Sequence, residues 1–240
     1  MGDRCFGDTR DLFKFDLVRH IMKSFPELER FLFVPMLMGT ASEGRRKNGA
    51  GKDLKRAYRS GKPGSQNQRL RDHLVRLQEI DSDLAYIEGI STYFDKEMIL
   101  IEVPGQQQFT NNGRGTYFRS VFSKLPKRSL IFIDPEIGLA EKSPDGRHLL
   151  FSEIETVSGR MDPGSVLMLF QYTHRKKDRA GIMTISARLE ERTGIPPVII
   201  TDSGQIFFIL TKNPRLAARL QDSLECYADT YPALECTGSA

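Results

Sequence analysis

Two carboxylates follow an apolar run in the middle of the chain. Residues 131–139 are IFIDPEIGL, so Asp134 and Glu136 come directly after side chains that suit a buried strand. A carboxylate at a strand end can orient or deprotonate a water molecule, or accept a hydrogen bond from a base amino group. The same residues also suit a simple turn after the strand, in which Pro135 restricts the backbone conformation and Gly138 allows a conformation that other residues rarely adopt. We predict that Asp134 is catalytic and that Glu136 has a supporting role in substrate binding.

Polar residues follow a second apolar run as well. After SVLMLF (165–170) come Gln171, Tyr172, His174 and Arg175. His174 suits general acid or base catalysis and Arg175 suits a phosphate contact, although a solvated basic turn would have the same composition. We predict that His174 is catalytic and that Gln171 and Tyr172 contact the substrate.

A glycine-containing polar segment lies between two further elements. Residues 105–117 include Asn111, Asn112 and Arg114 among glycines, which allow close approach of the backbone to a ligand. Amides can pair with a base edge and arginine with a phosphate, so we predict that Asn111 and Asn112 bind substrate and Arg114 binds phosphate. A flexible loop is the alternative. Three aromatic residues nearby can stack on an unpaired base, although the last also suits the core: Phe109, Tyr117 and Phe118.

One segment carries charge of almost a single sign. Between residues 45 and 71, lysines and arginines are opposed only by Asp53, and the glycines and the KPGS sequence at 62–65 predict a flexible insertion at about residues 39–67. Such a segment suits phosphate neutralisation, which gives affinity without sequence information, and a solubilising loop is the alternative. We predict DNA as the partner. Phosphate contacts are expected from six residues: Arg45, Arg46, Lys47, Lys52, Lys55 and Arg56.

Predicted helices and strands, which must position these residues, alternate along the chain. Helical spacing of apolar residues predicts helices at about 8–25, 68–80, 116–125, 147–157, 182–192 and after Asn213. Short apolar runs predict strands at about 31–37, 98–103, 130–133 and 165–170, and a hairpin at 198–211. This alternation indicates one Rossmann-like α/β domain, a three-layer sandwich with a mostly parallel sheet and a C-terminal antiparallel hairpin. Ligands of such sheets bind outside the carboxyl ends of the strands, where the polar residues described above gather.

The composition excludes a protein that crosses the membrane with a helix and a protein stabilised by a disulfide framework. The 240 residues are 39% hydrophobic and 28% charged with a net charge of +4, and no apolar stretch is long enough for a transmembrane helix. Three scattered cysteines form no disulfide framework, so we expect a cytoplasmic location and no membrane partner. No ligand spacing indicates zinc, and GAGKD at 49–53 lacks the first glycine and the hydroxyl of a phosphate loop. We therefore expect neither a metal nor a cofactor.

Three blocks of the chain resemble a family of mostly uncharacterised bacterial proteins. FGDTRDLFKFDLV (6–18), FIDPEIGL (132–139) and FQYTHR (170–175) are similar to that family's GD…D…KY.L, DPDNGL and YQH..R blocks. The chain differs at Phe15, where tyrosine is usual, and at Glu136-Ile137, where Asp-Asn is usual. More distantly, it is similar to anti-phage DNA glycosylases that remove glucosylated hydroxymethylcytosine. The resemblance implies one site, with Asp11 catalytic beside Asp134 and His174, and with Asp8 and Lys14 in contact with substrate.

Four functions fit these observations. Our main expectation is a DNA glycosylase of antiviral defence, which excises a modified base of the glucosylated hydroxymethylcytosine type from phage DNA and leaves abasic sites. A nucleic-acid methyltransferase dependent on S-adenosylmethionine is the second. The Asp134-Pro135 pair and the closing hairpin fit it, with Glu102 on a ribose, but the glycine-rich cofactor loop is missing. The others are a nuclease with Asp134 and Glu136 on Mg²⁺, and a non-catalytic nucleic-acid-binding module.

Overall fold

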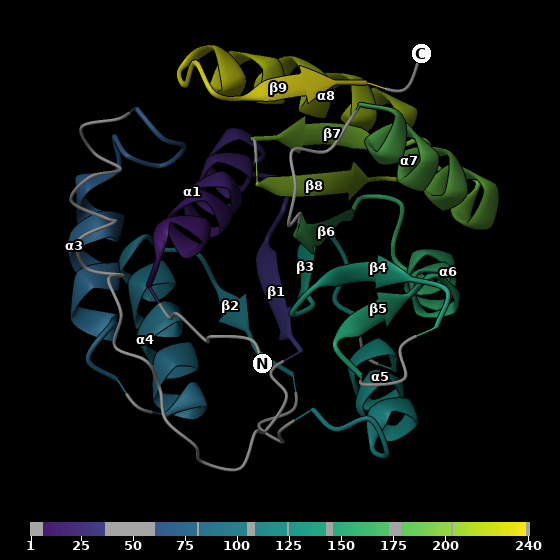
Figure 1. Cartoon of the computed structure of the whole chain (residues 1–240), viewed down its shortest axis with the longest axis horizontal. Coiled ribbons are helices and arrows are strands. Elements are labelled where there is room, and N and C mark those ends of the chain that lie inside the picture. Colours follow the sequence, from purple (N-terminus) through teal and green to yellow (C-terminus); the bar gives the residue numbers. More distant parts are fainter. Residues whose placement is uncertain are drawn as a thin grey trace.

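The chain forms a three-layer α/β sandwich of the Rossmann-like type. The structure is a computed structural model that describes residues 7–36, 61–80, 82–104, 109–123, 125–142, 146–172, 179–202 and 204–238. Its main sheet has seven strands in the order β2-β1-β3-β6-β8-β7-β9, and helices cover both faces (Figure 1). The predicted fold class is therefore confirmed.

The main sheet is parallel over its first four strands. These are β2 (Ile101–Glu102), β1 (Arg30–Pro35), β3 (Ser129–Asp134) and β6 (Val166–Tyr172). Antiparallel to β6 is β8 (Gln205–Leu210), which lies between β6 and β7 (Val198–Thr201), and β9 (Glu235–Thr237) pairs with β7. The predicted hairpin is thus present, but its second strand is inserted within the sheet, and β9 is the edge strand. A separate parallel pair consists of β4 (Gly138–Ala140) and β5 (His148–Leu150).

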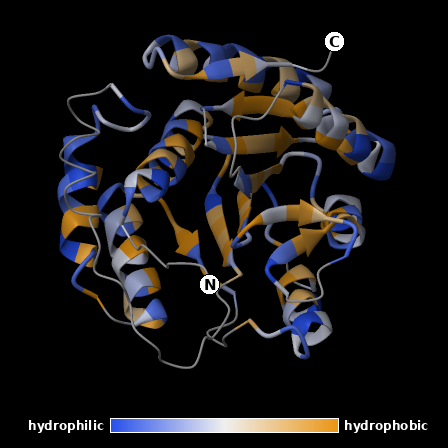
Figure 2. Cartoon of the chain, viewed as in Figure 1, coloured by the Kyte–Doolittle hydropathy of each residue, from blue (hydrophilic) through white to orange (hydrophobic). Residues whose placement is uncertain are grey.

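Each face of the sheet has its own helices and its own apolar core. One face is covered by α1 (Thr9–Ser24), α3 (Gln68–Leu77), α4 (Asp83–Lys96) and α8 (Pro214–Asp229), and the other by α5 (Arg114–Phe122), α6 (Phe151–Arg160) and α7 (Arg179–Thr193). Alternate strand residues serve the two cores, because successive side chains point to opposite faces: Phe31 and Phe33 pack on the first face, Leu32 and Val34 on the second. The inner strands are accordingly mostly apolar, and β7 and β8 are largely orange in Figure 2, whereas the edge strands β2 and β9 each contain a glutamate. Among the helices described, none has the length and apolar character needed to cross a membrane.

Several local predictions differ from the structure. The helix α4 was not predicted, and residues 148–150 form β5 where a helix was expected, with α6 beginning at Phe151. Most of the predicted insertion, residues 39–60, lies outside the described residues. At its far end, Pro63, Gly64 and Ser65 are buried. A Cβ on Gly64 would lie 2.7 Å from Leu12 O, so this part packs tightly on α1 and is not a flexible loop.

A buried carboxylate holds α1 between its neighbours. Asp16 accepts hydrogen bonds from Asn67 Nδ2 at 2.8 Å, from the Tyr227 hydroxyl at 2.7 Å and from the Tyr231 hydroxyl at 3.4 Å. Asn67 is the N-cap of α3 and Tyr227 belongs to α8. This contact fixes the helix whose first turns reach the carboxyl edge of the parallel strands.

Candidate functional site

The turn that begins α1 is fixed against α3. Gly7 has a φ of +70°, and a Cβ there would lie 2.5 Å from Leu74 O, so only glycine fits. The Gly7 carbonyl accepts a hydrogen bond from Gln78 Nε2 at 2.7 Å. Next to it, Asp8 is the N-cap of α1 and accepts from the backbone N–H of Arg10 at 2.8 Å. These contacts determine where the first turn of the helix lies.

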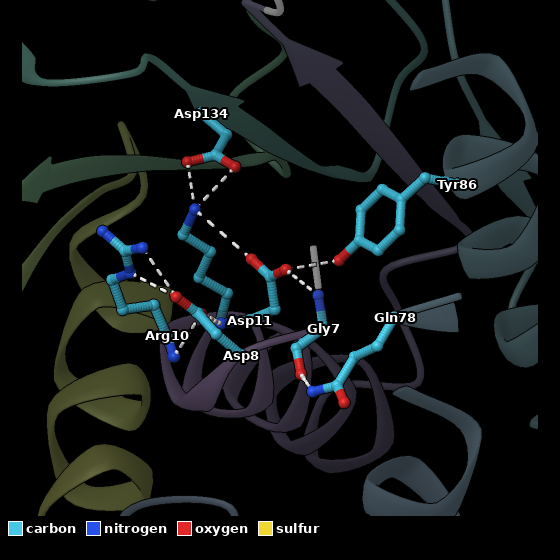
Figure 3. A network of polar contacts seen from close by, with 8 residues as sticks. Gly7, Asp8, Arg10, Asp11, Gln78, Tyr86 and Asp134 are labelled. Atoms are coloured by element: carbon cyan, nitrogen blue, oxygen red, sulfur yellow. Dashed lines mark hydrogen bonds and ion pairs between the residues drawn. The ribbon is translucent and has the colours of Figure 1, made fainter. Parts of the chain in front are cut away.

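Lys14 pairs with two carboxylates, Asp134 and Asp11, and the charge of Asp8 also raises its pKa. Figure 3 shows Asp134 across from Asp11 and Asp8. Lys14 Nζ lies 2.8 Å from each carboxylate oxygen of Asp134, at the end of β3, and 3.7 Å from Asp11 Oδ1. Only Oδ2 of Asp134 has hydrogen-bond geometry, so Oδ1 forms an ion pair without a hydrogen bond. We call Asp8, Asp11, Lys14 and Asp134 the carboxylate–lysine cluster.

Asp11 is held by donors from two other segments. Its Oδ2 accepts a hydrogen bond from the Gly7 N–H at 2.8 Å and another from the Tyr86 hydroxyl of α4 at 2.6 Å. Burial raises the pKa of Asp11 from 3.8 to about 6, partly offset by Lys14 and reinforced by Asp8. Asp11 therefore changes its protonation close to neutral pH.

The other members of the cluster have different electrostatic surroundings. Burial raises the pKa of Asp134, and the ammonium of Lys14 opposes that rise. Burial also disfavours the charged form of Lys14, but Asp134 and Asp11 more than compensate, and its pKa is raised. The pKa of Tyr86 is raised well above its usual value by burial and by the Asp11 carboxylate, so Tyr86 stays protonated and donates to Asp11.

Aromatic residues of β6 form the floor beside the cluster. Lys14 Nζ lies 4.1 Å from the centre of the Phe170 ring, and the Arg10 guanidinium lies 5.3 Å from the centre of the Tyr172 ring. Arg10 Nε also donates to Asp8 Oδ2 at 2.7 Å. Tyr172, at the end of β6, is thus next to the cluster, as its prediction as a substrate contact requires.

The structure brings together four of the five residues that the family resemblance places in one site: Asp8, Asp11, Lys14 and Asp134. The fifth, His174, lies outside the described residues, as do seven predicted phosphate contacts: Arg45, Arg46, Lys47, Lys52, Lys55, Arg56 and Arg175. Glu136 lies in the partly exposed turn between β3 and β4, and Asn111 and Asn112 are exposed in the turn before α5. Their substrate contacts stay predictions.

Gln171, predicted to contact substrate, forms hydrogen bonds within the fold through its side-chain amide. It is 7% exposed, and its Oε1 accepts from Leu139 N at 2.9 Å. Its Nε2 donates to Tyr172 O at 2.8 Å and to Ile137 O at 3.3 Å. The side chain also packs against Gly138, where a Cβ would lie 2.4 Å away. Because both the oxygen and the nitrogen of the amide form hydrogen bonds, Gln171 connects the β4 segment to β6.

Arg114 is likewise structural, where a phosphate contact was predicted. Its guanidinium makes two contacts with Glu153 of α6, Nε to Oε1 at 2.5 Å and Nη2 to Oε2 at 2.6 Å, and donates to His148 O at 2.6 Å. The aromatic residues expected to stack on a base are buried as well, since Phe109 and Tyr117 are 1% and 8% exposed and the Tyr117 hydroxyl donates to Pro35 O.

Four neighbours of the cluster were missed in the sequence: Gly7, Arg10, Tyr86 and Phe170. Gly7 and Arg10 stand within the block 6–18 beside Asp8, so that block carried a signal for them. Tyr86 carried none, because it reaches the site from the helix α4 that was not predicted. Phe170 was assigned correctly to a strand, but its contact with Lys14 depends on the packing of α1 over β6.

The chemistry available to the cluster follows from its unequal carboxylates. Asp134 lies against an ammonium at the carboxyl edge of parallel strands, where Rossmann-like sheets bind ligands. Asp11 can carry a proton near neutrality. Among the residues that the structure describes, no group of three or more histidine, cysteine or acidic side chains is arranged to hold a metal ion.

Comparison with known proteins identifies no relative by sequence. No family model matches the chain, and no curated protein matches it. Among solved structures, human methyltransferase-like protein 13 in complex with SAH is similar to it, with 14% identity, a TM-score of 0.43 and coverage of 92% of this chain and 90% of that chain. Such a likeness concerns the fold alone.

Proposed function

We propose that this chain is an enzyme that acts on a base of nucleic acid, with the carboxylate–lysine cluster as its reacting site. The reaction that the cluster supports best is hydrolysis of an N-glycosidic bond. The observation that carries this proposal is the pair of unequal carboxylates on either side of Lys14: Asp134 at 2.8 Å and Asp11 at 3.7 Å from Nζ. Carboxylates whose surroundings separate their protonation states are the usual acid and base of glycoside hydrolysis.

The proposed roles follow from these surroundings. As the bond between C1′ and the base nitrogen breaks, the Asp134 carboxylate stabilises positive charge on the sugar and accepts a proton from the attacking water, whose oxygen bonds to C1′. Asp11 transfers its proton to the departing base, and its pKa of about 6 leaves part of the population protonated at neutral pH. Lys14, 2.8 Å from the carboxylate, favours the ionised form of Asp134 against the burial that raises its pKa. The base must be extruded from a duplex to reach this edge.

Methyl transfer from S-adenosylmethionine is the second candidate, and the fold itself favours it. The hairpin that fits this class in the sequence is present: β8 lies antiparallel between β6 and β7, which run parallel to each other. The residues support it less. Glu102, the predicted ribose ligand, pairs in register with Leu32, three residues short of the strand end at Pro35, and its carboxylate is paired with Arg30. Fold alone does not determine a reaction, so we place the cluster's chemistry first.

One experiment separates the two reactions. Purified protein is incubated with phage DNA that contains glucosylated hydroxymethylcytosine and with unmodified DNA, each with and without S-adenosylmethionine, and the products are identified by mass spectrometry. Glycosidic hydrolysis releases a free base without the cofactor and leaves alkali-labile sites, and Asp134→Asn abolishes the release. Asp95→Asn, at an exposed position of α4, is the matched control.

The outcomes have distinct meanings. A methylated nucleotide that forms only with the cofactor would replace hydrolysis with methyl transfer. Free base released equally by the Asp134→Asn variant would remove the cluster from the mechanism. DNA that stays intact and unmodified in every arm would overturn both reactions for these substrates.

A further inference from the structure

A buried amide on the cluster's face of the sheet has an acceptor without a partner. Gln205, the first residue of β8, is 4% exposed, and its Oε1 receives no hydrogen bond from any residue that the structure describes. A buried amide oxygen without a donor is costly, and natural proteins rarely keep one without a reason. Gln205 was absent from the residues that the sequence marked as functional.

Strand pairing places Gln205 next to the cluster. It is the cross-strand partner of Tyr172, so the two side chains lie on the same face of the sheet. That face carries α1, since Tyr172 lies under the Arg10 guanidinium and Phe170, two residues earlier on β6, lies under Lys14. Gln205 therefore lies at the carboxyl end of β6, on the cluster's side of the sheet.

Asp134 lies on the same face of the sheet. Its Oδ1 is buried and lies 2.8 Å from Lys14 Nζ, so this oxygen is occupied by an ion pair and is not a free acceptor. Counting two strand spacings and two residues along the strands, the Cα atoms of Asp134 and Gln205 are about 12 Å apart, with the aromatic residues of β6 between them. At one end of this row the Asp134 carboxylate is paired with Lys14, whereas at the other end Gln205 Oε1 has neither a hydrogen bond nor an ion pair among the described residues.

We propose that Gln205 contacts the substrate and that its Oε1 accepts a hydrogen bond from an exocyclic amino group, so that the site selects amino-bearing bases, of the cytosine or adenine type, over bases with a carbonyl at that position. This assignment rests on the proposed function, namely that the ligand at this edge is a base. It holds for either reaction, because both require recognition of the base. Amides pair with base amino groups in this manner in other settings.

The experiment measures binding of the full chain to two fluorescent single-stranded oligonucleotides that are identical except for one central cytosine or uracil. We expect the wild-type protein to bind the cytosine probe about tenfold more tightly, the ratio that one such contact typically provides. In Gln205→Met, which keeps the side-chain length and removes the amide, the two affinities should become equal through weaker binding of the cytosine probe. Gln221→Met, at a partly exposed position of α8, should retain the preference.

A second measurement distinguishes a substrate contact from a structural role. If Oε1 is reserved for a ligand, Gln205→Met removes an unsatisfied buried acceptor, and the melting temperature without ligand should stay equal or rise. A lower melting temperature with the cytosine preference intact would overturn the inference, as would equal binding of both probes by the wild type. Binding of neither probe would instead overturn the proposed function, and the inference with it.

Discussion

Asp11 gives the cluster a pH dependence that can be measured in the folding equilibrium. Its pKa of about 6 in the folded protein is above the ordinary value of 3.8, so the folded state binds this proton more tightly than the unfolded chain. The stability that results is fully present below about pH 3.8 and is lost as the pH rises through about 6. A site residue thus makes the protein less stable at the pH where it would act, which is a common trade between stability and activity.

Replacing Asp11 by asparagine should flatten that dependence. The amide keeps an oxygen for the Gly7 N–H and the Tyr86 hydroxyl but does not ionise, so the free energy of unfolding should fall less steeply between about pH 3.8 and 6 than in the wild type. Urea unfolding across this range measures the slope. Asp95→Asn, at an exposed position, should follow the wild-type curve. Parallel curves for Asp11→Asn and wild type would contradict the proposed protonation.

Among the elements, the first turn of α1 has the strictest steric requirement. Gly7→Ala should lower the free energy of unfolding by about 1–3 kcal/mol, because a side chain at positive φ is strained and its Cβ would meet Leu74 O at 2.5 Å. The same substitution at Gly115 of α5, where a Cβ would meet nothing within 4 Å, should be neutral or slightly stabilising. Chemical denaturation of both variants makes the comparison. Equal effects at the two positions would show that the turn does not depend on glycine.

The contact between α5 and α6 depends on Arg114. In Arg114→Gln the partly buried carboxylate of Glu153 loses its charged partner and keeps only the Leu150 N–H, so we expect a loss of about 1–3 kcal/mol in unfolding free energy. The salt dependence of DNA binding should stay unchanged, because this arginine is committed within the fold. Arg119→Gln, at an exposed position of α5, should leave stability unaltered. A changed salt dependence in the Arg114 variant would restore its predicted role as a phosphate contact.

The local sequence pattern predicted most of the helices and strands, but not how they pack against one another. The strands β1, β3 and β6 and the N-caps Asp8 and Asn213 follow from apolar runs and capping residues. The helix α4 contains Gly89, which lowers helix propensity, and a Cβ there would lie 2.4 Å from the end of the Leu77 side chain of α3, which would have to shift.

In the candidate site, too, the sequence indicated residue types and strand ends but not the contacts made by packing. Asp134 could be selected because it ends a strand, and Asp8, Asp11 and Lys14 were grouped with it through the family resemblance. The partners of Gln171 and Arg114 could not be known, because Leu139 and Glu153 reach them only after β4 and α6 have packed. Gln171 and Arg114 were therefore predicted to contact substrate or phosphate, whereas in the structure they form hydrogen bonds within the fold.

For the whole molecule, the basic segment predicts how strongly binding to DNA depends on salt. Substituting Arg45, Arg46 and Lys47 together by glutamine should reduce the slope of log K against log salt by about 2 to 3 if each contacts a phosphate. Fluorescence anisotropy over a range of salt concentrations measures the slope. The triple variant Arg119→Gln, Lys127→Gln and Arg215→Gln, at exposed positions elsewhere, removes the same charge and should change the slope much less. Equal changes would mean that net charge alone governs binding.

The hydrogen bond between Asp16 and Tyr227 has a consequence for synthesis on the ribosome. Its partners are 211 positions apart, so at about 5–20 residues per second α1 emerges on the order of 10 to 40 s before the helix that completes its packing. During that interval Asp16 has no Tyr227 to bind, and the apolar surface that α1 later buries against α8 is uncovered. A nascent chain that stops before α8 would therefore hold Lys14 and Asp11 on a helix that is not yet seated. The cluster residues of α1 are thus among the first to be made, and α8, which packs on their helix, is among the last.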